Sequence, residues 1–119
     1  MNRRLKVLFV CAVNIQRSVT AEKLYSGHPQ LEVRSAGVHP IARKRVDEDD
    51  LKWADVIFVM ELEHKLWIET RFAGVQLPPM RVLNIPDRFE YMDPRLQDAL
   101  RELIDPAIAE VLASMGEGV

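Results

Sequence analysis

The sequence predicts an α/β fold, formed by one domain over residues 1–119. A length of 119 residues suits a single domain. Apolar runs typical of strands alternate with segments of helical periodicity, and the runs at residues 7–10 and 56–59 are apolar throughout. Strands of that kind are buried on both faces of a parallel sheet. The alternation therefore predicts βαβ units with right-handed crossovers, in which ligands bind beyond the carboxyl ends of the strands.

Four apolar runs are expected to form the strands, and they cover residues 6–11, 31–35, 55–60 and 80–85. Three helices are expected between them, over residues 18–26, 47–54 and 61–72. The first helix places Ala21, Leu24 and Tyr25 on one side. The second begins with acidic residues, which are favourable near the positive end of a helix dipole. Gly74 follows the third as a stop signal.

The last part of the chain is expected to be its longest helical region. Apolar residues three and four positions apart form one continuous stripe there: Leu96, Leu100, Leu103, Ile104, Ala107, Ile108, Val111, Leu112 and Met115. Pro106 lies within the stripe, and proline removes a backbone donor and clashes with the preceding turn. The sequence therefore predicts a kink or a break near residues 104–105.

The composition limits the classes of function. The 48% hydrophobic and 29% charged content is that of an ordinary soluble globular protein without a membrane-spanning stretch. A net charge of −2 argues against nucleic acid as a partner. A single cysteine excludes an internal disulfide framework and fits a cytoplasmic location. The three histidines are scattered without zinc-ligand spacing, so neither a metal nor a cofactor is expected.

One motif indicates a chemistry. Cys11 ends the first strand, and Arg17 and Ser18 follow where the first helix begins. The intervening residues are expected to form a phosphate-binding loop, and they are Ala12, Val13, Asn14, Ile15 and Gln16. Unpaired backbone N–H groups at a helix start bind oxyanions, and an arginine fork matches two phosphate oxygens. The same positive surroundings favour the thiolate of Cys11.

The motif predicts phosphoryl transfer, in which the Cys11 thiolate attacks phosphorus and water then hydrolyses the phosphocysteine. Ser18 is expected to donate a hydrogen bond to the thiolate. The alternative is structural, because a lone cysteine at the end of a strand is usually a small buried hydrophobic residue. The arginine and serine offsets, with a strand before and a helix after, favour the catalytic interpretation.

These residues resemble a known family, the low-molecular-weight protein tyrosine phosphatases. The resemblance rests on Val-Leu-Phe-Val-Cys at residues 7–11, on Asn14, Ile15, Arg17, Ser18, Ala21 and Glu22, and on residues 34–37 and 54–61. It implies a three-layer, phosphotyrosine protein phosphatase I-like fold with a four-stranded parallel sheet flanked by helices. It also implies hydrolysis of phosphorylated proteins or small aryl phosphates without a metal or cofactor.

The chain departs from the family pattern beside the nucleophile. Val13 stands where the family usually has glycine, which puts the shape of the loop in question. Gln16 replaces a second cysteine that is frequent in the family. The stretch between Gly37 and Asp47 is short, so the family's histidine that supports the loop asparagine has no clear counterpart. His39 is a candidate, and a solvated turn histidine is the alternative.

Two aspartates compete for the role of the acid that protonates the leaving group. The family's acid usually precedes a proline, as Asp93 does, but Asp93 is explained as the cap of the last helix. Asp87 follows the fourth strand at the expected site and falls where the family's acid belongs, although Arg88 replaces the proline. Asp87 is therefore favoured and Asp93 remains the alternative. Phe89 matches a family position that binds the phenyl ring, and packing onto the core is its alternative role.

Other activities of this fold are weighed in the same way. Arsenate reduction generally uses additional cysteines, so an internal relay is excluded for a chain with one cysteine. In the phosphoarginine branch a threonine tends to occupy the position of Ile15, and this favours tyrosine-type substrates here. A non-catalytic phosphate- or phosphoprotein-binding module is the alternative of a different class, because Val13 and Arg88 depart from the pattern.

Overall fold

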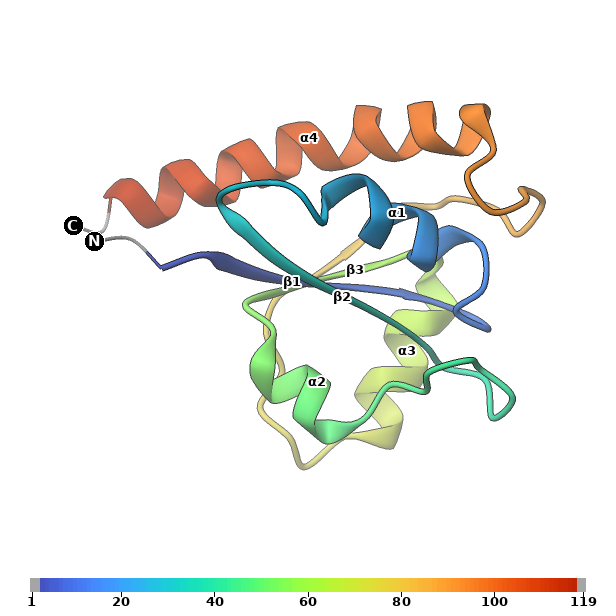
Figure 1. Cartoon of the computed structure of the whole chain (residues 1–119). Helices are drawn as coiled ribbons and strands as arrows, with labels where there is room; N and C mark the ends of the chain where they lie inside the picture. Colours follow the sequence, from blue (N-terminus) through green and yellow to red (C-terminus); the bar gives the residue numbers. More distant parts are fainter. Residues whose placement is uncertain (1–2, 118–119) are drawn as a thin grey trace.

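The computed structural model describes residues 3–117, and within them the expected α/β class is confirmed. Four parallel strands form one sheet in the order β2-β1-β3-β4. The strands are β1 (Leu5–Cys11), β2 (Leu31–Gly37), β3 (Val56–Val59) and β4 (Met80–Val82). Helices α1 (Arg17–Tyr25) and α4 (Pro94–Glu117) cover one face of the sheet, and α2 (Glu48–Trp53) and α3 (Leu62–Arg71) cover the other (Figure 1).

The central strand β1 explains why the apolar runs are continuous. Val7 and Phe9 point into a core shared with α1 and α4, while Leu8 and Val10 point into a second core on the α2 and α3 side. Phe9 packs on Phe58 of β3 with ring centroids 5.8 Å apart. A strand that is buried on both faces has no solvent-facing position for a polar residue, so its sequence does not alternate between apolar and polar residues.

Strand β2 is longer than expected and reaches Gly37 instead of residue 35. Gly37 pairs with Cys11, so the end of β2 lies directly beside the nucleophile candidate. A Cβ atom at Gly37 would lie 2.6 Å from the Ala12 carbonyl oxygen and 2.8 Å from the Ala42 Cβ. Only glycine therefore allows the loop after β1 and the segment after β2 to approach this closely.

Strands β3 and β4 are shorter than expected. β4 ends at Val82, but the Leu83 and Ile85 N–H groups still donate to carbonyls of the β3 side. Asn84 between them has a φ of 58°, in the left-handed region that asparagine tolerates. Beyond this residue the Ile85 carbonyl accepts from Arg17, so the chain after β4 reaches the beginning of α1.

Helix α4 runs through Pro106 as one element (Figure 1), so the expected break near residues 104–105 is wrong, and a kink there stays a prediction. Leu100 and Ile104 before the proline and Ala107 and Ile108 after it are all buried in the same core. This burial holds both halves on the sheet, while Glu102, whose carbonyl loses its helical partner, lies on the exposed side. Leu103 was expected in the apolar stripe, but it is 43% exposed and does not belong to the buried side of α4.

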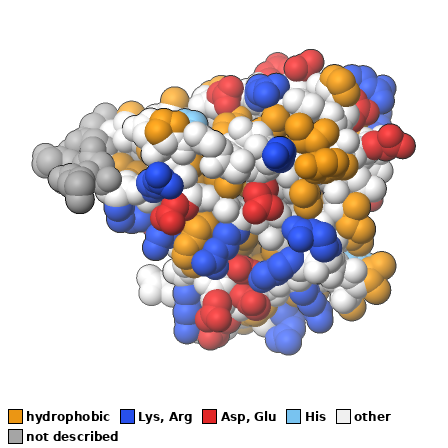
Figure 2. All heavy atoms as spheres, viewed as in Figure 1, with side chains coloured by type: hydrophobic (Ala, Val, Ile, Leu, Met, Phe, Trp, Pro, Cys, Tyr) orange, Lys and Arg blue, Asp and Glu red, His pale blue; other side chains and the backbone are white. Residues whose placement is uncertain are grey.

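The surface carries charges of both signs. Figure 2 shows basic and acidic side chains intermixed over the face in view. Several of these charges are paired, such as Arg3 with Asp55 and Lys52 with Glu48. No helix within residues 3–117 has the length and apolar character needed to cross a bilayer.

Candidate active site

The loop between β1 and α1 lies at the carboxyl end of the sheet and makes its tight turn at Asn14. Asn14 has a φ of 58°, and the other positive φ values among residues 3–117 belong to Asn84 and Met92. Val13 therefore does not occupy the left-handed region, where a β-branched residue would be strained. The turn that glycine would ease falls one residue later, on a residue type that tolerates it.

The loop offers backbone donors at the start of α1. In the described part of the chain, the N–H groups of Val13, Ile15 and Gln16 donate to no other group. The first N–H groups of any helix also lack helical partners, and they carry the positive end of its dipole. Such a cluster of donors binds an anion. The Ile15 side chain is 51% exposed beside them.

The Cys11 sulfur is buried at the base of this loop and is held by two groups. It lies 2.9 Å from the Ser18 hydroxyl oxygen, and the Asn14 backbone N–H donates to it at 3.2 Å. The Asn14 side-chain amide donates to the same hydroxyl oxygen at 2.8 Å. That oxygen accepts from Asn14 and can donate its own proton to the sulfur, so Asn14, Ser18 and Cys11 form one hydrogen-bonded group.

Arg17 is buried, and its guanidinium is fixed from three sides. One terminal nitrogen, Nη1, donates to Glu61 Oε2 at 2.8 Å and to the Ile85 carbonyl at 2.8 Å. Nε lies 3.9 Å from a carboxylate oxygen of Asp87. A buried cation needs such compensation, and here the partners come from the chain segments that follow β3 and β4.

The two aspartates proposed as the acid lie in different surroundings. The Asp87 side chain is 57% exposed and faces Arg17. Asp93 instead accepts from the Arg95 backbone N–H at 2.9 Å and pairs with the Arg95 guanidinium at 3.0 Å. Hydrogen bonds from Arg95 hold the pKa of Asp93 below its usual range. Asp93 thus stabilises the beginning of α4, and this geometry leaves Asp87 as the aspartate beside the loop.

Phe89 is engaged with the protein on several sides. It is partly buried and packs against the core under α4. The guanidinium groups of Arg88 and Arg95 lie 5.4 Å and 5.7 Å from its ring centroid. Cation–π contacts of this kind hold the ring in place. The structure therefore supports the packing role of Phe89, and binding of a phenyl ring by this residue stays a prediction.

His39 makes no hydrogen bond to the Asn14 side chain. It is exposed, and its Nδ1 accepts from the Ile41 N–H at 3.3 Å, as in a solvated turn. Arg43 supports the loop instead, because its backbone N–H donates to the Val13 carbonyl at 3.0 Å and its Nε to the Asn14 carbonyl at 3.2 Å. The Asn14 side-chain oxygen is buried without a hydrogen-bond partner within residues 3–117.

Glu61 and His64 belong to the site although the sequence motif does not include them. Glu61 lies two residues after the end of β3 and holds Arg17, and its own backbone N–H donates to His64 Nδ1 at 3.1 Å. Burial and the positive charge of Arg17 lower the pKa of His64. The position of Glu61 after a buried strand was a usable signal, because β3 ends at the same edge of the sheet as β1.

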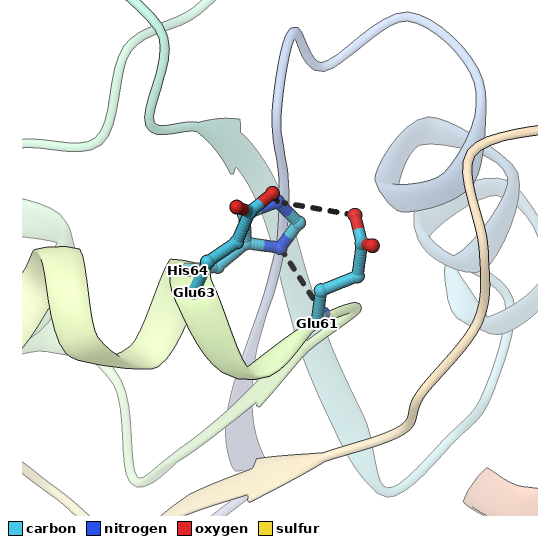
Figure 3. Close-up of side chains that lie close together, drawn as sticks. All are labelled: Glu61, Glu63 and His64. Carbon is cyan, nitrogen blue, oxygen red and sulfur yellow. Dashed lines mark hydrogen bonds and ion pairs between the residues drawn. The ribbon is translucent and has the colours of Figure 1, made fainter.

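Glu61, Glu63 and His64 also form the group that most resembles a metal site in the described residues. Their potential ligand atoms lie within 4.8 Å of one another at the beginning of α3 (Figure 3). However, His64 Nδ1 accepts a hydrogen bond, so in the neutral ring the proton must reside on Nε2. A protonated nitrogen cannot coordinate a metal, so this arrangement does not fit one.

Comparison with known proteins identifies the fold. The structure is similar to the YwlE arginine phosphatase of Geobacillus stearothermophilus, with a TM-score of 0.75, 23% identity and coverage of 95% of this chain and 96% of that one. It is also similar to SP-PTP, a low-molecular-weight protein tyrosine phosphatase of Streptococcus pyogenes, with a TM-score of 0.72, 17% identity and coverage of 89% and 92%.

A third similar structure is the tyrosine phosphatase Wzb of Escherichia coli K30 in complex with phosphate, with a TM-score of 0.69, 19% identity and coverage of 88% and 96%. No protein-family model matches the chain, and no relative is found among curated proteins. The chain therefore has the fold of the low-molecular-weight protein tyrosine phosphatases, as the resemblance of its loop motif implies.

Proposed function

We propose that the protein is a phosphatase that hydrolyses phosphomonoesters through Cys11, with phosphotyrosine or another aryl phosphate as its substrate. One observation carries the proposal, the surroundings of the Cys11 sulfur. The sulfur accepts from the Asn14 N–H and lies within hydrogen-bond distance of the Ser18 hydroxyl, at the base of a loop whose N–H groups of Val13, Ile15 and Gln16 are unpaired in the described part of the chain. A buried structural cysteine needs none of these contacts. The pattern is that of an activated nucleophile beside an anion site.

The reaction proceeds in two balanced steps. The Cys11 thiolate attacks phosphorus, the S–P bond forms, the P–O bond to the leaving group breaks, and Asp87 gives its proton to the departing oxygen. Water then attacks phosphorus, Asp87 takes its proton, and the S–P bond breaks to release phosphate and the thiolate. Arg17 and the loop N–H groups stabilise the charge on the equatorial oxygens in both steps.

Phosphoarginine is the second candidate substrate. The similarity to the Geobacillus stearothermophilus arginine phosphatase favours it. Ile15 favours an aryl phosphate, because its side chain is 51% exposed beside the loop donors and offers an apolar contact to a ring. Comparing kcat/KM for one peptide phosphorylated on tyrosine and the same peptide phosphorylated on arginine separates the two. An Ile15→Thr protein should lose preference for the tyrosine form.

The primary test is turnover of p-nitrophenyl phosphate at mildly acid pH. Cys11→Ser and Arg17→Ala proteins should lose measurable turnover, because they lack the nucleophile and the phosphate fork. Arg4→Ala, which removes an exposed arginine remote from the motif, is the matched control and should keep it. A wild-type protein that binds phosphate or vanadate without any turnover would instead be a phosphate-binding module of the same fold.

A further inference from the structure

The imidazole ring of His64 lies near both the backbone N–H and the side-chain carboxylate of Glu61. The Glu61 backbone N–H donates to His64 Nδ1 at 3.1 Å, and Glu61 Oε2 lies 3.7 Å from His64 Nε2 (Figure 3). The same Oε2 atom accepts from Arg17 Nη1 at 2.8 Å. A single imidazole therefore fixes the backbone from which Glu61 projects and faces the carboxylate that holds Arg17.

The hydrogen bond to Nδ1 defines the state in which His64 performs this contact. Nδ1 must be unprotonated to accept, so Nε2 carries the proton. That nitrogen is buried and has no hydrogen-bond partner within residues 3–117, and carboxylate oxygens of Glu61 and Glu63 lie 3.7 Å and 3.9 Å from it. A second proton on Nδ1 would remove the acceptor for the Glu61 N–H and create an imidazolium beside both carboxylates.

The groups around His64 come from several segments. Glu61 and Glu63 lie at the beginning of α3, Arg17 lies in α1, and Asp87 lies in the segment after β4. His39, from the segment after β2, lines a cavity of about 330 Å³ together with His64. Burial and Arg17 lower the pKa of His64, and the three carboxylates oppose this. His64 is therefore neutral at pH 7 and becomes protonated at a lower pH than an ordinary histidine.

We propose that His64 is a positioning residue whose neutral form keeps Glu61 on Arg17, and whose protonation draws Glu61 away and weakens phosphate binding by Arg17. The proposal deepens the proposed phosphatase function and rests on it. Without Glu61, the buried Arg17 still contacts the Ile85 carbonyl and the more distant Asp87 carboxylate. Arg17 consequently loses its fixed position as the pH falls, and this effect is separate from any ionisation of Cys11 or the substrate.

Two variants at His64 and one control test the proposal by activity. In His64→Asn the side-chain oxygen takes the place of Nδ1 as acceptor but does not titrate, whereas His64→Leu has no acceptor. Glu69→Gln, an exposed carboxylate on α3, is the matched control. At pH 7 we expect His64→Asn to retain most of kcat/KM and His64→Leu to lose about tenfold, as expected for one lost positioning interaction.

The pH dependence separates positioning from mere support of the helix. The ratio of wild-type to His64→Asn kcat/KM cancels the ionisation of substrate and nucleophile. We expect this ratio to fall by about tenfold in total as the pH drops through the pKa of His64, and to be constant above the ordinary histidine pKa of about 6.5. A ratio that stays flat at low pH, with both proteins folded, overturns the proposal.

Imidazole NMR with phosphate binding tests the proposal without turnover. The ¹⁵N shifts of neutral His64 should report a proton on Nε2, and the titration should have its midpoint below that of an ordinary histidine. Inorganic phosphate should bind more weakly as His64 becomes protonated, and less so in His64→Asn. A neutral ring with its proton on Nδ1 overturns the proposal. If His64 titrates as expected and phosphate binding follows it, but the protein has no turnover, the phosphatase assignment alone is overturned.

Discussion

At the scale of single residues, Asn14 performs three tasks at the base of the loop. Its backbone adopts the left-handed turn, its N–H donates to the Cys11 sulfur, and its side-chain amide donates to Ser18. A glycine at position 13 is therefore unnecessary, because the unusual dihedral angle belongs to the next residue. The buried and unpaired Asn14 side-chain oxygen is the cost of this arrangement.

Substitutions of Asn14 separate its backbone role from its amide. Asn14→Gly accepts a φ of 58° without strain, whereas Asn14→Ala does not, so we expect Ala to be less stable to urea by about 1 kcal/mol. Both variants lose the hydrogen bond that orients Ser18, and we expect turnover to fall by about tenfold or more in both. Full activity of Asn14→Gly would show that the amide has no catalytic part.

The acid assignment makes a second prediction at this scale. Asp87→Asn should lower kcat on phenyl phosphate by about 100-fold, because general acid catalysis typically contributes at least that much. The loss should be smaller on p-nitrophenyl phosphate, whose leaving group needs less protonation. Asp93→Asn should keep activity and stability nearly unchanged, since asparagine caps helices as well as aspartate. A larger kcat loss in Asp93→Asn, at equal stability, contradicts the assignment.

At the scale of elements, strand ends position the chemistry. Cys11 ends β1, Glu61 follows β3, and Ile85 and Asp87 follow the turn after β4. Because these strands are parallel neighbours, their carboxyl ends meet at one edge and surround Arg17. The short segment after β2 completes the edge through Arg43, whose Nε donates to the Asn14 carbonyl, while His39 is the solvated turn histidine of the alternative interpretation.

Helix α4 provides the prediction for an element. Pro106→Ala restores a backbone donor inside a helix whose buried side is already packed on the sheet. We expect the free energy of unfolding to rise by about 1–2 kcal/mol. Alanine has the higher helix propensity, and part of that gain is lost because proline also lowers the conformational entropy of the unfolded chain. Urea denaturation measures this change. A loss of stability would mean that α4 needs the proline for its path along the sheet.

At the scale of the whole molecule, two cores on either side of one sheet hold the site together. The core under α4 includes Phe9, Phe58 and Leu100, and the one under α2 and α3 includes Leu8 and Val10. Cys11 lies at the end of β1, the strand whose two faces are buried in these two cores. Stability of the cores and geometry of the loop are therefore coupled through β1.

A pair of leucines on α4 tests this packing. Leu100 is fully buried, whereas Leu103, three residues later, is 43% exposed. Leu100→Ala should lower the free energy of unfolding by about 2–5 kcal/mol through lost burial and a residual cavity. Leu103→Ala should change it by less than about 1 kcal/mol. Equal losses for the two variants would place α4 differently on the sheet from the arrangement seen here.

The sequence by itself determined the class of the fold, the strand that carries Cys11, the loop with Arg17 and Ser18, and the preference for Asp87. These follow from local causes: apolar runs that need burial on both faces, a helix start that exposes donors, and a cap that occupies Asp93. The bounds expected for α1, α2 and α3 agree with the structure to within one residue, because the signals that begin and end a helix are local.

Only the tertiary structure decided what holds Arg17, where the tight turn of the loop falls, and whether α4 continues through Pro106. The partners of Arg17 are 44 and 68 residues away along the chain, so no local pattern connects them. The continuity of α4 depends on burial on both sides of the proline, which outweighs a local propensity of about 3 kcal/mol. Contacts between distant segments set these features, and neighbouring residues in the sequence do not.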